Sequence, residues 1–257
     1  AMEAIHSATA ARRFDGIKVS SRITDWAAVV HQKQALVEEL RAAKYTDVLP
    51  NYNAISYIEG AAQFSDDGEL SVAGNPVQAR KTIIATGSRP HVPEIPGLES
   101  VPFHDSTSIL ELETLPASLI VMGGGYIGVE LAQVFARAGV KVTIVSRRGL
   151  LPESEPEIGT ALTSYFEAEG NVVRSELQYE RVEHDGDGVA LNITAPARSQ
   201  TLRAEALLLA TGRVPNTHGL NLDVAGVRIN GNGGIHVDAA LMTSREGVYA
   251  VGDVTGR

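Results

Sequence analysis

The hydrophobic pattern is most regular between residues 118 and 145. The apolar run SLIVM is followed by the glycine turn GGG, by YIGVELAQVFARAG with apolar positions at helical spacing, and by the second apolar run VKVTIV. A short apolar run after turn residues predicts a strand, and apolar residues three and four positions apart predict a helix with one buried face. This segment is therefore predicted to be a strand–helix–strand unit.

Other stretches carry weaker patterns of the same two kinds. Residues 24–45 and 157–169 keep apolar positions at helical spacing, and Thr24 or Asp25 can cap the first of these helices. The Pro-rich stretch SRPHVPEIPG cannot continue a helix or a central strand, so a linker is predicted between Gly87 and Ala117. Short strands are predicted at 55–59, 70–72 and 81–85, around 172–173, 182, 189–193 and 202, and at 206–209.

One internal repeat relates two distant strands. KTIIATGSRP at 81–90 and ALLLATGRVP at 206–215 share an apolar run, the letters ATG, a short polar step and a proline. Their alanines, Ala85 and Ala210, are separated by the length of a whole domain, whereas solenoid repeats have periods of about 20 to 50 residues. The repeat predicts two copies of a dinucleotide-binding layout, of which the first lacks its opening glycine loop.

Composition narrows the class of protein. The chain has 257 residues, of which 44% are hydrophobic and 21% charged, and this balance excludes extensive disorder. The net charge of -9 opposes nucleic acid, and no apolar run reaches the roughly 18 to 20 residues of a membrane helix. We therefore expect a soluble, cytoplasmic chain without a nucleic-acid or membrane partner. Cysteine is absent, which excludes disulfides, thiolate metal sites and thiol nucleophiles from these residues.

The glycine turn satisfies the pattern GxGxxG with Gly123, Gly125 and Gly128. In a dinucleotide-binding unit the first glycine permits the tight turn, the second lets backbone N–H groups approach a pyrophosphate, and the third lets the helix pack on the strand. The helix then presents its partially positive end to the phosphates. In this context the pattern predicts cofactor contacts along the segment, including Ile127. A glycine turn used only for packing is the alternative.

The end of the second strand bears on the choice of nucleotide. A carboxylate at this place accepts hydrogen bonds from the ribose 2'-hydroxyl of NAD, but here the residue is Ser146. Arg147 and Arg148 follow, and their guanidinium groups can neutralise a 2'-phosphate with charge-assisted hydrogen bonds. We therefore predict NADPH as the ligand. Two arginines that are merely solvated in a turn are the alternative.

Further strand ends carry small residues or a carboxylate. Thr86 with Gly87, and Gly212, end the two ATG strands, where small residues let a ligand approach the backbone. GVYAVGD ends in Asp253, whose carboxylate can accept hydrogen bonds from a sugar or ribityl hydroxyl. Packing glycines and an exposed turn aspartate are the alternatives.

The remaining polar residues give little sign of a catalytic or metal site. The seven histidines lack metal-ligand spacing and show no arrangement for nucleophilic catalysis, so no metal site is predicted. The acidic stretch PESEPE at 152–157 is predicted to be a solvated helix start rather than a catalytic pair of carboxylates. No catalytic residue is assigned within the chain.

The stretches EGAAQF, ATGSRPHVPEIPG, GGGYIGVELA, ATGRVPN and GVYAVGD occur in one order along the chain. In this combination the sequence resembles the flavin-containing class I pyridine nucleotide-disulfide oxidoreductases. Within that family, FDGI, WAAVVHQKQALVEELRAAKYTDVL and REGVYAVGDVTGR look most like the mercuric reductases. The resemblance covers essentially all 257 residues, and it implies FAD and NADPH as cofactors and Hg(II) as the substrate.

The resemblance also implies the contacts of FAD. Ala62 in EGAAQF would hold the adenine edge through its backbone, Thr86 and Gly87 would lie near the flavin nucleotide, and Asp253 would bind the ribityl chain. The family opens with an FAD-binding glycine loop, which this chain lacks. The isolated chain is therefore expected to bind FAD weakly or not at all.

On the nicotinamide side, the resemblance implies roles for four residues. Tyr126 stands where glutathione-type reductases place a ring over the nicotinamide pocket, and Glu130 stands near the nicotinamide end. Gly212 and Arg213 would lie by the nicotinamide and the flavin face.

The implied fold is α/β, a Rossmann-like doubly wound FAD/NAD(P)-binding fold with the NADP domain inserted into an incomplete FAD domain. The expected boundaries are a partial FAD domain at 1–116, an NADP domain at 117–218 and a returning FAD segment at 219–257. The family also has a Cys-x4-Cys redox pair near its start and a dimerisation domain at its end. The chain is therefore expected to be a fragment of a homodimeric enzyme.

The implied reaction passes a hydride from NADPH to FAD and two electrons to the cysteine pair, which reduces Hg(II) to Hg(0). A glutathione-type disulfide reductase and dihydrolipoamide dehydrogenase are the alternative enzymes, the latter disfavoured because Ser146 replaces the expected carboxylate. A nucleotide-binding module without turnover is the alternative from outside the enzymes.

Overall fold

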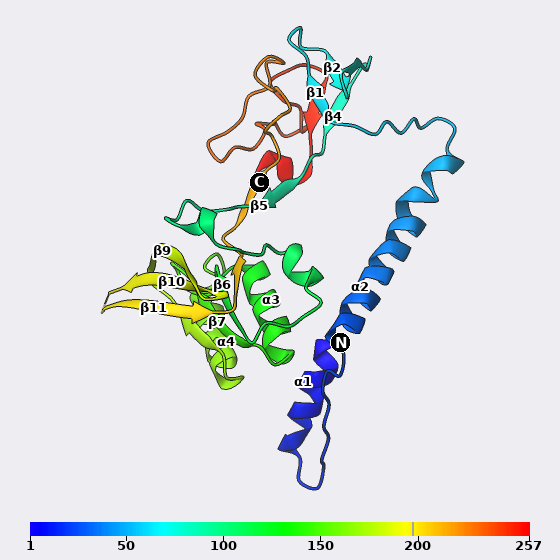
Figure 1. Cartoon of the computed structure of the whole chain (residues 1–257). Coiled ribbons are helices and arrows are strands. Elements are labelled where there is room, and N and C mark those ends of the chain that lie inside the picture. The colour runs from blue at the N-terminus through cyan, green and yellow to red at the C-terminus, as the bar shows by residue number, and fades with distance from the viewer. Residues whose placement is uncertain (197) are drawn as a thin grey trace. The chain divides into compact units, whose positions relative to one another are not determined.

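A computed structural model describes residues 1–196 and 198–257 of the chain (Figure 1). These residues form two compact units, and each unit is built from separate segments of the chain. The larger unit contains residues 1–38 and 90–212, and the smaller unit contains 39–89 and 213–257. In the part of the chain that the structure describes, no helix is long and apolar enough to span a membrane. The domain boundaries expected at 116 and 218 stay a prediction.

The larger unit is built on a four-stranded sheet in the order β12-β6-β7-β8, in which all neighbours are parallel. Helix α3 (Tyr126–Arg137) connects β6 to β7, and α4 (Pro156–Ala168) lies between β7 and β8. This confirms the predicted strand–helix–strand unit and the α/β fold class. The strands are β6 (Ser118–Met122), β7 (Lys141–Val145), β8 (Val172–Arg174) and β12 (Ala206–Leu209).

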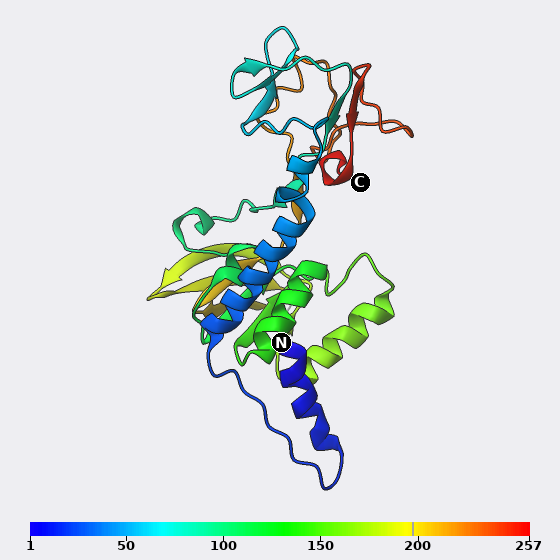
Figure 2. The ribbon, with the colours of Figure 1, turned by 90° about the vertical axis from the view of Figure 1, so that its right-hand side faces the viewer.

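Both faces of this sheet are covered, which explains why its strands read as continuous apolar runs. Leu119 and Val121 belong to one core with residues of α3 and α4, in which Phe135 is fully buried. Ile120 and Met122 belong to a second core with an antiparallel sheet of order β11-β10-β9. The strands of this second sheet are drawn in yellow in Figure 2. Burial of such a side chain stabilises the fold by roughly 1.5–3 kcal/mol. The meander strands are β9 (Gln178–Asp185), β10 (Gly188–Ala195) and β11 (Arg198–Ala204).

The chain begins with two helices, α1 (Met2–Ala10) and α2 (Trp26–Arg41). The predicted cap of α2 is confirmed at Asp25, whose Oδ1 accepts a hydrogen bond from the Ala28 N–H at 3.0 Å. Trp26 contacts the ring of Phe135 at 6.0 Å between centroids, and its Nε1–H donates to the Leu112 carbonyl at 2.7 Å. The start of α2 is therefore fixed to the larger unit, and the helix continues into a π-helical turn, Ala42–Thr46.

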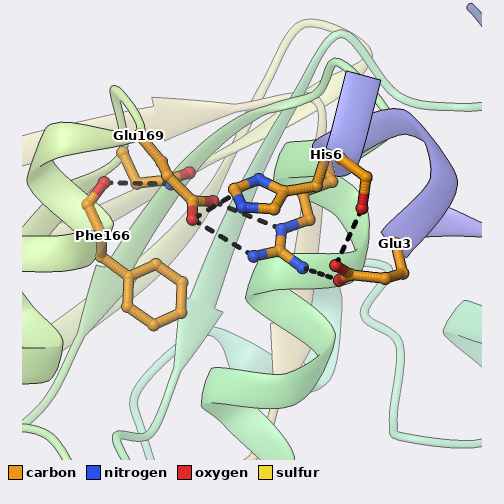
Figure 3. Close-up of polar contacts among 7 residues, drawn as sticks. Glu3, His6, Phe166 and Glu169 are labelled. Carbon is orange, nitrogen blue, oxygen red and sulfur yellow. Dashed lines mark hydrogen bonds and ion pairs between the residues drawn. The ribbon is translucent and has the colours of Figure 1, made fainter. Parts of the chain in front are cut away.

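Helix α1 contacts α3 through a group of charged residues (Figure 3). The Arg137 guanidinium, in the last turn of α3, forms ion pairs with Glu3 at 3.0 Å and with Glu169 at 3.3 Å. His6 of α1 also points toward Glu169, with 3.9 Å between its Nδ1 and the carboxylate. A cation near a helix C-terminus interacts favourably with the helix dipole. Arg137 thereby links α1 to the end of α4.

Residues 91–117 differ from the predicted linker. They contain no helix or strand other than the 3-10 turns Leu98–Ser100 and Ser108–Glu111, in agreement with the prolines. Leu98 and Val101 nevertheless pack in the core beneath the meander, and Ile109 is fully buried in the other core. The stretch is therefore a packed part of the larger unit, because its apolar residues outweigh its lack of regular backbone hydrogen bonds.

The smaller unit contains short strands around a core that includes Ile235, Ala250 and Val254. β4 pairs in parallel with β14, β5 pairs with β13, and β1, β2 and β3 form an antiparallel sheet. A 3-10 turn at Leu49–Asn51 and another at Gly252–Thr255 complete it. The strands are β1 (Ala62–Phe64), β2 (Leu70–Val72), β3 (Asn75–Pro76), β4 (Thr82–Ile84), β5 (Ser88–Pro90), β13 (Arg213–Pro215) and β14 (Val248–Ala250).

The strand predicted at 55–59 is wrong. These residues adopt no regular structure, and Ile55, Tyr57 and Ile58 are exposed. β-branched and aromatic residues favour strands only where a neighbouring strand pairs with them and their side chains pack. Neither condition is met at 55–59, so the residue types alone predicted a strand that does not form.

Candidate nucleotide-binding site

The glycine loop between β6 and α3 contains two glycines that packing requires. Gly123 has φ +120°, and a Cβ at this position would lie 2.1 Å from the carbonyl oxygen of Ala210. A Cβ on Gly128 would lie 2.3 Å from the Gly123 carbonyl oxygen. The loop, the helix and the end of β12 can therefore approach one another only because these side chains are absent.

Gly125 differs from both, because a Cβ added there would meet no atom within 4 Å. It is the N-cap of α3 and has no side-chain capping hydrogen bond. The first N–H groups of a helix have no partner within the helix and attract anions. The open side of the loop is therefore suited to binding phosphate, as the GxGxxG pattern predicts.

A pocket of the larger unit lies over this loop. The glycine loop supplies Gly123, Gly124, Gly125 and Tyr126, and the turn after β7 supplies Ser146, Arg147 and Arg148. Residues 151–153, Tyr179 and the end of β12 at 210–212 complete the lining. The structure thus brings together the predicted phosphate loop, both predicted arginines and Gly212.

The turn after β7 is fixed by Ser146, which is buried. Its Oγ donates to the Gly149 carbonyl at 2.7 Å and accepts from the Arg148 N–H at 3.4 Å. This hydroxyl is used by the turn itself, whereas the side chains of Arg147 and Arg148 are exposed at the pocket. The arrangement places positive charge where a dinucleotide fold presents its adenine ribose.

Tyr179 of β9 forms part of the pocket wall and was missed by the sequence analysis. Its hydroxyl donates to the Val145 carbonyl at 2.9 Å, which joins the meander to the end of β7. Burial raises the pKa of Tyr179 to about 12, while the positive charge of Arg147 acts in the opposite direction. The phenol is therefore a neutral hydrogen-bond donor throughout the physiological pH range.

This raised pKa gives a test of the geometry. In an ultraviolet titration of the folded protein, the signal that is lost in Tyr179→Phe should have a midpoint near pH 12. Because the unfolded phenol has an ordinary pKa of 10.0 while the folded one stays protonated, stability from this group is present below pH 10 and lost as the pH rises toward 12. A midpoint near 10 for the difference signal would show that Tyr179 is solvated.

The predicted solvated helix start at 152–157 is confirmed, because Glu153 is exposed and α4 begins at Pro156. Pro152 and Glu153 also line the pocket, which the sequence did not indicate. Three residues of α3 that were predicted to contact the cofactor do not line this pocket. Ile127 is half-buried against the core, Gly128 packs against the Gly123 carbonyl, and Glu130 is exposed on α3.

Tyr126 is 65% exposed at the start of α3 and forms a hydrogen bond with Ser154, with 3.1 Å between the two oxygens. The ring therefore lies at the rim of the pocket. Its expected role beside a nicotinamide stays a prediction.

The smaller unit holds the residues expected to contact FAD. Asp253 accepts a hydrogen bond from the Ser88 hydroxyl at 2.7 Å, and the Arg213 Nε–H donates to the same hydroxyl at 2.7 Å. Asp253 and Arg213 line one pocket of this unit together with Ser88, which the sequence analysis did not single out. The group offers a carboxylate and a guanidinium to a ligand.

The other expected FAD contacts lie outside this pocket lining. The Thr86 hydroxyl donates to the Asn216 carbonyl at 2.8 Å, and the Gly87 carbonyl accepts from the Asn216 N–H at 2.9 Å. Ala62 pairs with Val72 at the start of β1. These contacts hold the end of β4 and the edge of β1, and the assignments to FAD stay predictions. Among the described residues, no group of three or more His, Cys, Asp or Glu side chains could hold a metal ion.

Comparison with known proteins identifies the family. A family model described as "Pyridine nucleotide-disulphide oxidoreductase" matches residues 5–257, so the chain belongs to this family of flavin-dependent oxidoreductases. This match confirms the α/β fold class predicted for the chain and the family resemblance of its motifs.

Named relatives point within that family to one group. The chain is 42% identical to the mercuric reductase of Streptomyces lividans, covering 99% of this chain and 55% of that protein. It is 40% identical to the mercuric reductase of Bacillus cereus, covering 94% of this chain and 38% of that protein. The chain thus spans about half the length, or less, of the curated relatives it matches.

A solved structure gives the same picture of the fold. The HOCl-induced flavoprotein disulfide reductase RclA from Escherichia coli superposes with a TM-score of 0.83 at 33% sequence identity. The match covers 98% of this chain and 55% of that chain.

Proposed function

We propose that the larger unit binds NADPH and acts within a mercuric reductase, in which a hydride passes from NADPH to FAD and electrons pass on to a cysteine pair that reduces Hg(II) to Hg(0). The observation that carries the NADPH part is the pocket over the glycine loop. It joins an uncapped helix N-terminus, suited to a pyrophosphate, with Arg147 and Arg148, suited to a 2'-phosphate. The similarity to mercuric reductases supports the choice of metal substrate.

The FAD part of the proposal rests on the smaller unit. Asp253 would accept hydrogen bonds from the ribityl hydroxyls, and Arg213, joined to it through Ser88, would lie beside the flavin. FAD held by these residues would supply a hydride acceptor and a two-electron carrier. Thr86 and Gly87 would contribute to this site through the end of β4.

The protein has no cysteine among its 257 residues, and the proposed reaction needs a thiolate pair to hold Hg(II). The pair would therefore come from residues outside this sequence. A disulfide reductase is the second candidate, because the superposed structure carries that description at 33% identity.

The test compares electron acceptors for the complete protein encoded by the surrounding reading frame. We expect NADPH oxidation that depends on Hg(II) and exceeds the oxidation driven by oxidised glutathione or lipoamide. Faster oxidation with a disulfide, and none with Hg(II), would replace the mercuric reductase proposal with the second candidate.

The 257-residue chain alone should show no Hg(II)-dependent NADPH oxidation, even with added FAD. Without a thiolate, no residue of the chain offers a low-potential electron donor to the metal. The measurement is NADPH absorbance with and without Hg(II), and the complete protein is the positive control. Turnover by the short chain would overturn the role assigned to the cysteine pair.

A further inference from the structure

The side chains of the two pocket arginines have different surroundings. The Arg148 guanidinium forms an ion pair with Glu153, with 2.6 Å between Nη2 and the carboxylate oxygen. No ion pair among the described residues includes Arg147. Both arginines and Glu153 line the same pocket. An anion that entered the pocket would therefore meet Arg147, which has no carboxylate partner in the described part of the chain, and Arg148, which is already paired with Glu153.

The segment that carries Glu153 is fixed to the glycine loop. The Leu151 N–H donates to the Gly124 carbonyl at 2.7 Å, and the Ser154 N–H donates to the Leu151 carbonyl at 2.9 Å. On the far side of Glu153, the hydroxyls of Ser154 and Tyr126 form their hydrogen bond. Glu153 is thus held between two attachments to the loop that would carry the pyrophosphate.

We propose that Glu153 is a specificity-determining residue of the nucleotide pocket, which lowers the affinity for 2'-phosphorylated adenine nucleotides by occupying Arg148. This inference rests on the proposed binding of NADPH. A 2'-phosphate would have to take the place of the carboxylate on Arg148, whereas an unphosphorylated ribose would leave the ion pair intact. Glu153 therefore reduces the discrimination that the two arginines would otherwise provide.

The test measures binding of 2',5'-ADP and 5'-AMP, which differ in the 2'-phosphate and need neither flavin nor turnover. Glu153→Gln should tighten 2',5'-ADP binding about three- to fivefold, the effect expected of an exposed ion pair, and leave 5'-AMP unchanged. Glu155→Gln is the matched control. It removes the same charge two residues away, at the N-cap of α4, and Glu155 does not line the pocket.

The same substitution in an Arg148→Ala protein distinguishes an effect of the ion pair from repulsion between Glu153 and the phosphate. In an Arg148→Ala protein, Glu153→Gln should give no gain, because the carboxylate then has no arginine to occupy. The same gain in both backgrounds, or no gain in either, would overturn the proposal. Weaker 5'-AMP binding in Glu153→Gln would also overturn it, since Glu153 would then bind the unphosphorylated ribose.

Failure of the proposed function would look different. If the wild-type chain binds 2',5'-ADP no more tightly than 5'-AMP, and Arg147→Ala plus Arg148→Ala changes neither affinity, then the NADPH assignment is wrong and the role of Glu153 falls with it. If the double variant lowers only 2',5'-ADP affinity while Glu153→Gln changes nothing, only the inference about Glu153 fails.

Discussion

Gly123→Ala should destabilise the larger unit by about 3 kcal/mol or more and abolish NADPH binding. The new methyl group would lie 2.1 Å from the Ala210 carbonyl oxygen, which is backbone and cannot move without disturbing β12. The backbone at φ +120° is also costly for any residue with a Cβ. Denaturant unfolding and NADPH titration measure the two losses.

Gly125→Ala is the matched control, because it adds the same methyl group where the structure has open space. Its backbone, at φ -77° and ψ 179°, suits alanine, so stability should change by less than about 1 kcal/mol. The methyl group would nevertheless occupy the position where a pyrophosphate approaches, and NADPH affinity should fall about tenfold. Equal loss of stability in the two variants would contradict the difference in packing between Gly123 and Gly125.

Arg147→Ala combined with Arg148→Ala should lower the preference for NADPH over NADH by about 30-fold, because two bonds would give about 100-fold and Glu153 already offsets about three- to fivefold of it. Each charge-assisted bond to a phosphate is worth about 1.5–3 kcal/mol, and 1.4 kcal/mol corresponds to a tenfold change in affinity. The low end of that range applies, because both side chains are exposed. Calorimetric titration with each nucleotide gives the ratio.

Two other exposed arginines of the same unit provide the control for net charge. Arg181 on β9 and Arg203 on β11 form ion pairs with neighbouring acids and do not line the pocket. Their double replacement by alanine should leave the nucleotide preference unchanged. An unchanged ratio in the Arg147 and Arg148 variant would show that these arginines are solvated turn residues.

The sequence predicted those parts of the fold in which local pattern and burial agree. The runs at 118–122 and 206–209 are buried on both faces, so their apolar residues identify the strands directly. At 55–59 the same residue types are exposed and unpaired, and the prediction failed because pairing is a property of the whole fold. The packing of 91–117 was missed for a similar reason, since proline spacing says nothing of burial.

Some residues of the candidate site could likewise be predicted from the sequence, and others could not. The glycines at 123, 125 and 128 and the arginines at 147 and 148 could be predicted, because a strand–turn–helix pattern fixes their place along the chain. Glu153 and Tyr179 could not, because one lies on an irregular loop and the other on the meander that covers the opposite face of the sheet. Their positions depend on tertiary packing rather than on spacing.

The most direct test of the NADPH pocket is a crystal structure of the chain with NADPH bound. We expect the pyrophosphate at the N-terminus of α3 beside Gly125, and the 2'-phosphate on Arg147 with Arg148 turned from Glu153 toward it. Binding of NADPH elsewhere, or a 2'-phosphate directed into solvent away from both arginines, would contradict the account.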